Sequence, residues 1–126
     1  MHDDGSKDCS STREARRQLA RIEYIRACSL AEEALARKQR EQKMYSIAEE
    51  RLLKRKETKE YYAQRNCPGG WSEQDESELR DVEAEVKNAA ERCAMADFSF
   101  NQLSRARDRA KNEYDLIMGD VNVNEG

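Results

Sequence analysis

The residues of this chain best suited to chemistry are its thiols and its single imidazole. The four cysteines stand far apart in the sequence, at Cys9, Cys28, Cys67 and Cys93. A structural zinc site needs four converging nitrogen or sulfur ligands, and its cysteines usually come in closely spaced pairs. The sequence has no such pair, so the spacing predicts no metal site. Because no secretory signal is recognisable either, we expect the thiols to be reduced.

No catalytic arrangement is recognisable in the sequence. The only histidine is His2, and the chain has no glycine-rich phosphate loop and no G-x-S-x-G elbow. A long helical chain also lacks the deep pocket that a small molecule needs. We therefore expect a protein that is not an enzyme and that binds no cofactor, no metal ion and no small-molecule substrate.

Composition narrows the structural class. Charged residues make up 39% of the 126 residues and hydrophobic ones 37%, with one proline and five glycines. An α/β domain needs many turns, and this supply of turn residues serves few. Apolar runs are too short for a membrane span or the core of a signal peptide. The composition predicts a soluble, intracellular, cytoplasmic protein of the all-α class, with no membrane insertion.

The first expected element is a long helix. Residues 12–66 contain neither glycine nor proline and are rich in residues of high helix propensity. Ser11, with Glu14 three residues later, matches a capping box at its start. The sequence then breaks at Pro68 and Gly69, which suit the second and third positions of a type II turn.

The second expected element is a helix over residues 73–118. Ser72 is a good N-cap residue with Asp75 at the N3 position, and Gly119 is placed to end the helix. The predicted organisation is therefore a hairpin between two tails: residues 1–10 form a disordered N-terminal tail, 11–118 the helical hairpin with its turn at 67–72, and 119–126 a flexible C-terminal tail.

Both helices repeat residues at alternating spacings of three and four, which is the pattern of a coiled-coil seam. The second helix gives the clearer series: Leu79, Val82, Val86, Ala89, Cys93, Ala96, Phe100, Leu103, Arg107, Ala110, Tyr114 and Ile117. The first helix gives a less apolar one: Tyr24, Ala27, Ala31, Ala34, Lys38, Glu41, Tyr45, Ala48, Leu52, Arg55, Lys59 and Tyr62. A short turn makes the helices antiparallel, so the sequence predicts a long two-helix antiparallel coiled-coil hairpin.

Laid antiparallel, the two series pair Leu52 with Ala89 and Tyr24 with Ile117. Charge favours the same topology, because the first helix carries 15 basic and 9 acidic residues and the second 7 basic and 12 acidic. The basic run 51–59 then lies beside the acidic start of the second helix. We therefore interpret that run as paired within the hairpin rather than as a site for phosphates.

The middle of the seam contains charged residues, at Lys38, Glu41 and Arg107. In the predicted pairing Glu41 faces Phe100, where an unpaired carboxylate would be costly. Either the helices separate there and leave Phe100 and Leu103 available to a partner, or the first helix rotates to offer Leu35 and Met44. We expect Phe100 to be partly exposed.

The strongest indication of function is an excess of apolar residues over 19–36, where twelve of eighteen residues are apolar. One partner helix covers a single stripe of such a segment. Ile22, Ile25 and Leu30 point elsewhere, so we expect them to hold a protein partner or a second copy in a helical bundle. Trp71, beside the turn, either covers the end of the first helix or anchors a partner.

A row of arginines precedes and overlaps this apolar segment, at Arg13, Arg16, Arg17, Arg21 and Arg26. Most of the row lies beyond the reach of the second helix. It forms either a solvated face or a contact surface for an anionic partner, which would be nucleic acid or an acidic protein.

These observations predict a non-enzymatic coiled-coil interaction or structural subunit of a larger assembly, docking through the apolar open end of the hairpin. A small helical chaperone is the first alternative. In outline the hairpin resembles prefoldin and tubulin cofactor A, although it shows neither the strand pair of the former nor the third helix of the latter. A nucleic-acid-associated helical protein that uses the arginine row is the second alternative.

Overall fold

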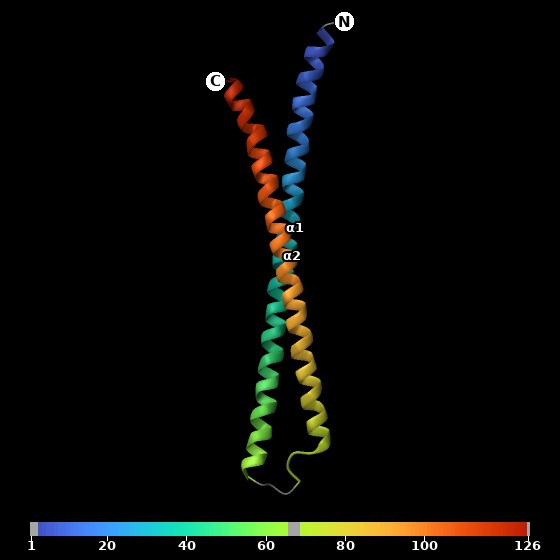
Figure 1. Ribbon diagram of the computed structural model, residues 1–126, viewed down its shortest axis with the longest axis vertical. Coiled ribbons are helices and arrows are strands. Elements are labelled where there is room, and N and C mark those ends of the chain that lie inside the picture. The colour runs from blue at the N-terminus through green and yellow to red at the C-terminus, as the bar shows by residue number, and fades with distance from the viewer. Residues whose placement is uncertain (1–2, 66–68, 126) are drawn as a thin grey trace. The chain divides into compact units, whose positions relative to one another are not determined.

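The computed structural model describes residues 3–65 and 69–125, which form two helices and no strand (Figure 1). Helix α1 spans Asp3–Arg65 and helix α2 spans Glu73–Glu125. The chain divides into two compact units, each with a segment of both helices. Unit 1 combines Met1–Leu35 with Ser99–Gly126, and unit 2 is Ala36–Phe98.

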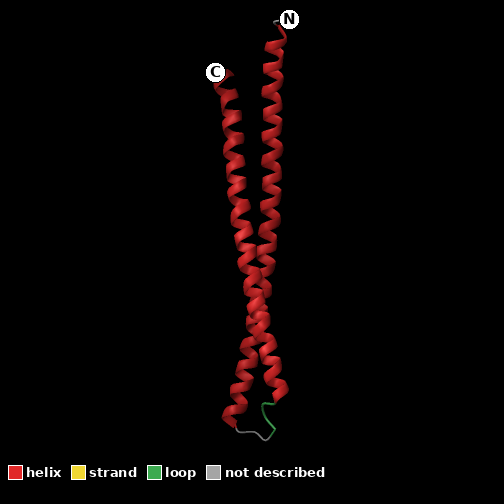
Figure 2. Cartoon of the chain, turned by 45° about the vertical axis from the view of Figure 1, so that its right-hand side comes forward, coloured by secondary structure: helices red, strands yellow, loops and turns green. Residues whose placement is uncertain are grey.

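In each unit the α1 segment lies beside the α2 segment and runs in the opposite direction (Figure 1, Figure 2). In unit 2 the two segments are joined by the turn, so that this unit is a helical hairpin by itself. The predicted all-α class and the antiparallel pairing of two long helices are confirmed.

Both helices extend further than the sequence predicted. Helix α1 starts at Asp3 instead of residue 12, so Ser11 lies inside the helix, and its side chain lies outside the described ones. Helix α2 passes through Gly119 and ends at Glu125 instead of Met118. A helical glycine costs only about 1 kcal/mol relative to alanine, and neither end contains a proline to stop the helix.

The turn and the start of α2 follow the predicted local chemistry. Gly69 has a φ of 73°, as the third position of a type II turn requires, while Pro68 lies outside the described residues. The backbone N–H of Asp75 donates to Ser72 Oγ at 3.1 Å, and the N–H of Ser72 donates to Asp75 Oδ2 at 3.0 Å. The predicted N-cap is confirmed as a reciprocal capping box.

Alanine dominates the buried core of the described residues. The buried hydrophobic residues are Ala20, Ala31, Ala34, Ala48, Leu79, Val82, Ala89 and Ala96. All but Ala20 belong to the predicted seam series, and every predicted seam position of α2 is buried or half-buried. The periodicity therefore identified the correct face of each helix.

The register of the two helices differs from the predicted pairing by one seam position. In unit 1 the rings of Tyr24 and Tyr114 lie 5.7 Å apart, whereas the sequence paired Tyr24 with Ile117. In unit 2 Ala89 shares a groove with Ala48, whereas the sequence paired it with Leu52. An alanine-rich seam buries nearly the same surface after such a shift, so the repeat pattern alone did not distinguish the two registers.

Candidate protein-binding surface

Large hydrophobic side chains lie mostly outside the seam. Four of the exposed ones fall within one stretch of α1 in unit 1, with exposed fractions of 57% for Leu19, 49% for Ile22, 58% for Ile25 and 43% for Leu30. The sequence expected Ile22, Ile25 and Leu30 to point away from α2, and all three are exposed. Their role in holding a partner stays a prediction.

Three of these side chains form what we call the aliphatic ridge: Leu19, Ile22 and Ile25. Residues spaced by three along an α-helix follow one ridge on its surface, and such ridges pack into the grooves of another helix. The seam residues Ala20 and Tyr24 lie between them in sequence and are buried or half-buried. The aliphatic ridge therefore occupies a part of α1 that α2 does not cover.

The arginine row divides into two groups. Arg13, Arg16, Arg21 and Arg26 are exposed and have no ion pair with any described residue. Arg17 is half-buried; its Nη1 lies 3.5 Å from Glu14 Oε2, and its buried Nε has no hydrogen-bond partner among the described atoms. Four of the five arginines predicted to contact an anionic partner thus remain available on the surface.

In contrast, three of the five basic residues of the run 51–59 in unit 2 pair with α2, and Lys54 pairs with Glu50 of α1. The Nη1 atoms of Arg51 and Arg55 lie 2.9 and 2.7 Å from carboxylate oxygens of α2. Lys59 Nζ lies 2.9 Å from Glu76 Oε2. This arrangement agrees with the interpretation that residues 51–59 serve the hairpin. The carboxylates that pair with the two arginines are Glu85 and Glu78.

Two of the three charged residues in the middle of the seam form ion pairs across it, while the third, Arg107, contacts Asp108 and Ser104 of its own helix. Arg92 Nε donates to Glu41 Oε2 at 3.2 Å, and Lys38 Nζ lies 2.8 Å from Asp97 Oδ1. Helix α1 does not rotate to bury its alternative apolar face, because Met44 stays exposed. A charge at a seam position is tolerated here because its partner stands at the rim, where water still reaches both groups.

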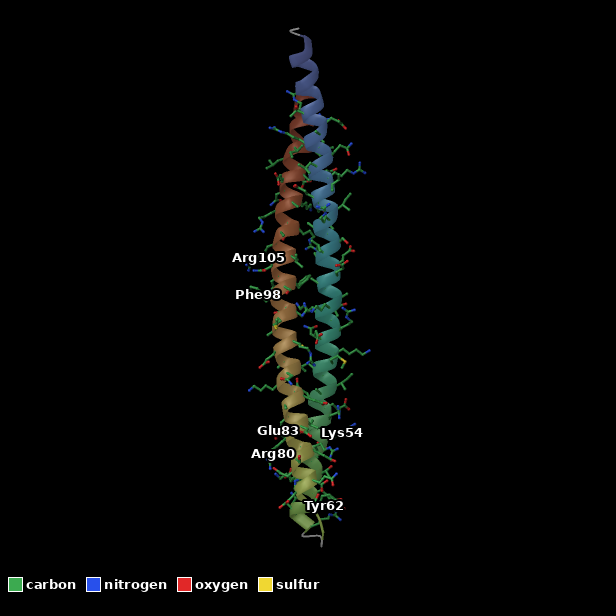
Figure 3. All side chains as sticks on the ribbon, turned by 90° about the vertical axis from the view of Figure 1, so that its right-hand side faces the viewer. Lys54, Tyr62, Arg80, Glu83, Phe98 and Arg105 are labelled. Atoms are coloured by element: carbon green, nitrogen blue, oxygen red, sulfur yellow. The ribbon has the colours of Figure 1, made fainter. Side chains whose placement is uncertain are left out.

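The two α2 residues predicted to contact a partner, Phe100 and Leu103, are half-buried. The more exposed aromatic residue is Phe98, at 63%, with Met95 at 64% three residues before it. Figure 3 shows Phe98 on the side of α2 turned away from α1. Neither residue was among the predicted contact residues. The signal that could have found them is the position of both residues outside the seam series.

Trp71 is half-buried and held within unit 2. Its indole N–H donates to Glu76 Oε2 at 2.6 Å, and Lys59 Nζ lies 5.9 Å from the ring centroid. Hydrogen bonds from Lys59 and then Trp71 hold the pKa of Glu76 below its usual value. These contacts give the indole a structural role at the start of α2, and its role as a partner anchor stays a prediction.

The described cysteines show no sign of a reactive or metal-binding centre. Cys28 and Cys93 are free and half-buried, and burial raises the pKa of the Cys93 thiol. Among the described residues no three His, Cys, Asp or Glu side chains gather as metal ligands would. Cys9 and Cys67 lie outside the described side chains. Neither described helix contains a stretch apolar and long enough to span a bilayer.

Comparisons with known proteins do not assign this chain to a family, so its class is described by the fold. A scan against protein-family models, a search of curated proteins and a search of solved structures find no match. The class is an all-α protein of two long antiparallel helices with an alanine-rich seam and large aliphatic residues on the outside.

Proposed function

We propose that this chain is a non-enzymatic interaction or structural subunit of a larger protein assembly, and that it docks through the exposed apolar residues of α1 in unit 1. The observation that carries the proposal is the distribution of hydrophobic side chains. Six of the eight buried hydrophobic residues are alanines, whereas Leu19, Ile22, Ile25 and Leu30 are exposed.

The energetic argument follows from side-chain size. Full burial of a leucine or isoleucine stabilises a fold by about 1.5–3 kcal/mol, and one methyl-sized group by only about 0.8 kcal/mol. The most deeply buried positions of the seam therefore hold mainly small side chains. A protein that covers the aliphatic ridge would bury larger ones. Clustered exposed aliphatic residues are typical of interaction surfaces, while single ones are ordinary.

The proposal is tested by the size of the complex that the chain forms in its own cells. Extracts with the tagged wild-type chain, Ile25→Asp or the control Ser46→Asp are fractionated by gel filtration. We expect the wild type and Ser46→Asp, a change at an exposed polar position of α1, to elute in an assembly well above the 14.6 kDa chain. Ile25→Asp should elute at the size of the free chain. Equal elution of all three would contradict the proposal.

The two alternatives from the sequence have different signatures in the same extracts. A holdase chaperone would associate with clients only after heat stress and would suppress the aggregation of a denatured test protein. A nucleic-acid-associated protein would lose its large complex after nuclease treatment and with added salt. The subunit proposal requires a complex that resists nuclease and exists without stress.

A further inference from the structure

The aliphatic ridge and the arginines beside it form one surface, and we propose that this surface binds an acidic amphipathic helix of a partner protein. The inference rests on the proposed function, because it gives the chemistry of the partner that the ridge would hold. It is carried by the position of the unpaired arginines relative to the exposed aliphatic side chains.

Arginines border the aliphatic ridge on both flanks. Residues four apart are neighbours on a helix surface, so Arg21 lies next to Ile25 on one flank and Arg26 next to Ile22 on the other. The row of residues spaced by three that contains Leu19 also continues toward the N-terminus through arginine at positions 16 and 13. An apolar strip of three side chains thus has an exposed guanidinium group on each flank and two beyond its N-terminal end, with one carboxylate, Glu23, beside Leu19 on the flank of Arg26.

The charge on this surface is not compensated by ion pairs among the described side chains. Residues 12–29 contain five arginines and two glutamates, and Arg21 and Arg26 pair with no described carboxylate. In unit 2 the corresponding basic residues find glutamates on α2, at 2.7–2.9 Å. In unit 1 the α2 residues on either side of Tyr114, whose ring lies beside that of Tyr24, are Glu113 and Asp115, and neither forms an ion pair with a described arginine. The α2 segment before them is basic over residues 105–111, with Arg105 turned away from α1 (Figure 3).

An acidic amphipathic helix matches both features of the surface. Its apolar side chains at positions i, i+3 or i+4 and i+7 would cover the aliphatic ridge, in the way that amphipathic helices occupy apolar grooves. Its glutamates or aspartates on either side would meet the bordering guanidinium groups, and arginine binds carboxylates through paired, charge-assisted hydrogen bonds. Electrostatic complementarity of this kind sets orientation and partner choice.

Three other occupants fit less well. A second copy docked through the same surface would bring two clusters of net charge +3 together, which opposes association. Nucleic acid would use the arginines but leave the aliphatic ridge without apolar contacts, because bases stack on aromatic side chains. A bilayer surface would require a wider apolar face than three side chains.

The inference is tested with the purified full-length chain and two labelled synthetic peptides. Both peptides carry leucine at i, i+3 and i+7 in a helical frame; one has glutamate at the flanking positions and the other lysine. Binding is followed by fluorescence anisotropy at 50 and 300 mM salt. The variant is Arg21→Gln with Arg26→Gln. The matched control is Arg37→Gln with Arg40→Gln, which removes the same charge from exposed positions of α1 in unit 2.

We expect the acidic peptide to bind, the lysine peptide not to bind, and affinity to fall with salt. The Arg21/Arg26 variant should weaken binding about fivefold or more, as loss of two exposed charge pairs would, while the control leaves it unchanged. Equal binding of both peptides, or equal affinity of variant and control, would overturn the inference.

The same preparation decides among the other occupants. Tighter binding to phosphatidylserine vesicles or to a 20-base-pair RNA duplex than to the acidic peptide would overturn the acidic-helix inference. A dimer mass in light scattering that Ile25→Asp abolishes would overturn it in favour of a second copy. If the acidic peptide fails while Ile25→Asp still releases the chain from its cellular assembly, only the partner chemistry is wrong. If that release also fails, the proposed function itself is wrong.

Discussion

The two glycines Gly69 and Gly119 adopt different backbone conformations, so replacing each by alanine should change stability in opposite directions. Gly69 has a φ of 73°, while Gly119 lies inside α2, and an added Cβ would meet no atom within 4 Å at either position. We expect Gly69→Ala to lower the free energy of unfolding by about 1–2 kcal/mol, because alanine disfavours positive φ. Gly119→Ala should raise it by up to about 1 kcal/mol through helix propensity. Urea denaturation followed by circular dichroism measures both.

The pair of substitutions also tests where α2 ends. If Gly119→Ala destabilised the chain as Gly69→Ala is expected to, the glycine would stand in the left-handed conformation of a helix terminus. That result would restore the helix end predicted from the sequence.

Glu41 shows how a charge is kept at a seam position. Its side chain is 22% exposed and accepts a hydrogen bond from Arg92 Nε. We expect Arg92→Leu to reduce the free energy of unfolding by about 1 kcal/mol, because the half-buried Glu41 carboxylate then loses its hydrogen-bond partner. Glu41→Leu should stabilise the chain by a similar amount, since an apolar side chain suits the seam.

Thermal and urea unfolding of both single variants and the double variant gives the coupling energy. Lys56→Leu, which removes an exposed charge from α1 without breaking an ion pair between described residues, is the control for a change in net charge. Similar losses of stability from Glu41→Leu and Arg92→Leu would contradict this view, because the pair would then be a net stabiliser of the seam.

At the scale of the element, the start of α2 responds to pH. Hydrogen bonds from Ser72 hold the pKa of Asp75 below its usual value, and those from Lys59 and Trp71 do the same for Glu76. A carboxyl group with a lowered pKa stabilises the fold above its unfolded pKa of about 4 and loses that contribution as pH falls through the folded value. We expect unfolding at pH 3 to need less urea than at pH 7.

Removal of the cap separates this effect from general acid denaturation. Ser72→Ala should cost about 1 kcal/mol at pH 7, where Asp75 is ionised and bonded, and less at pH 3. Ser46→Ala, at an exposed position in the middle of α1, is the control. A Ser72→Ala effect that is equal at both pH values would contradict this prediction, because the bond from the Asp75 N–H to Ser72 Oγ would then be independent of the charge on the Asp75 carboxylate.

At the scale of the whole chain, the register can be tested by crosslinking. In a background without the four native cysteines, Ala48→Cys with Ala89→Cys is expected to form a disulfide readily, because both positions are buried in one seam and line the same groove. Leu52→Cys with Ala89→Cys, the pair that the sequence suggested, should form it slowly. The rates are measured by non-reducing electrophoresis during mild oxidation. The opposite order would restore the predicted register.

The amino-acid sequence by itself determined the class, the faces and the local caps. Helix propensity and alternating spacings of three and four depend only on neighbours along the chain, so the seam positions from Leu79 to Ile117 could be read directly. The capping box at Ser72 joins residues three apart, for the same reason. The apolar excess around Ile22 and Ile25 indicated an uncovered surface, whereas Met95 and Phe98 were overlooked because the seam residues Cys93, Ala96 and Phe100 stand beside them in the sequence.

Only the tertiary structure decided the register and the charge partners. In unit 1 the rings of Tyr24 and Tyr114 lie 5.7 Å apart, and in unit 2 Ala48 and Ala89 line one groove, so each unit is shifted by one seam position from the predicted pairing. The alanine seam gives little preference between neighbouring registers, since a methyl group fits every layer. We therefore attribute the register to the turn and to cross-helix ion pairs such as Arg92 with Glu41. These pairs join residues far apart in the chain, so no local sequence pattern predicts them.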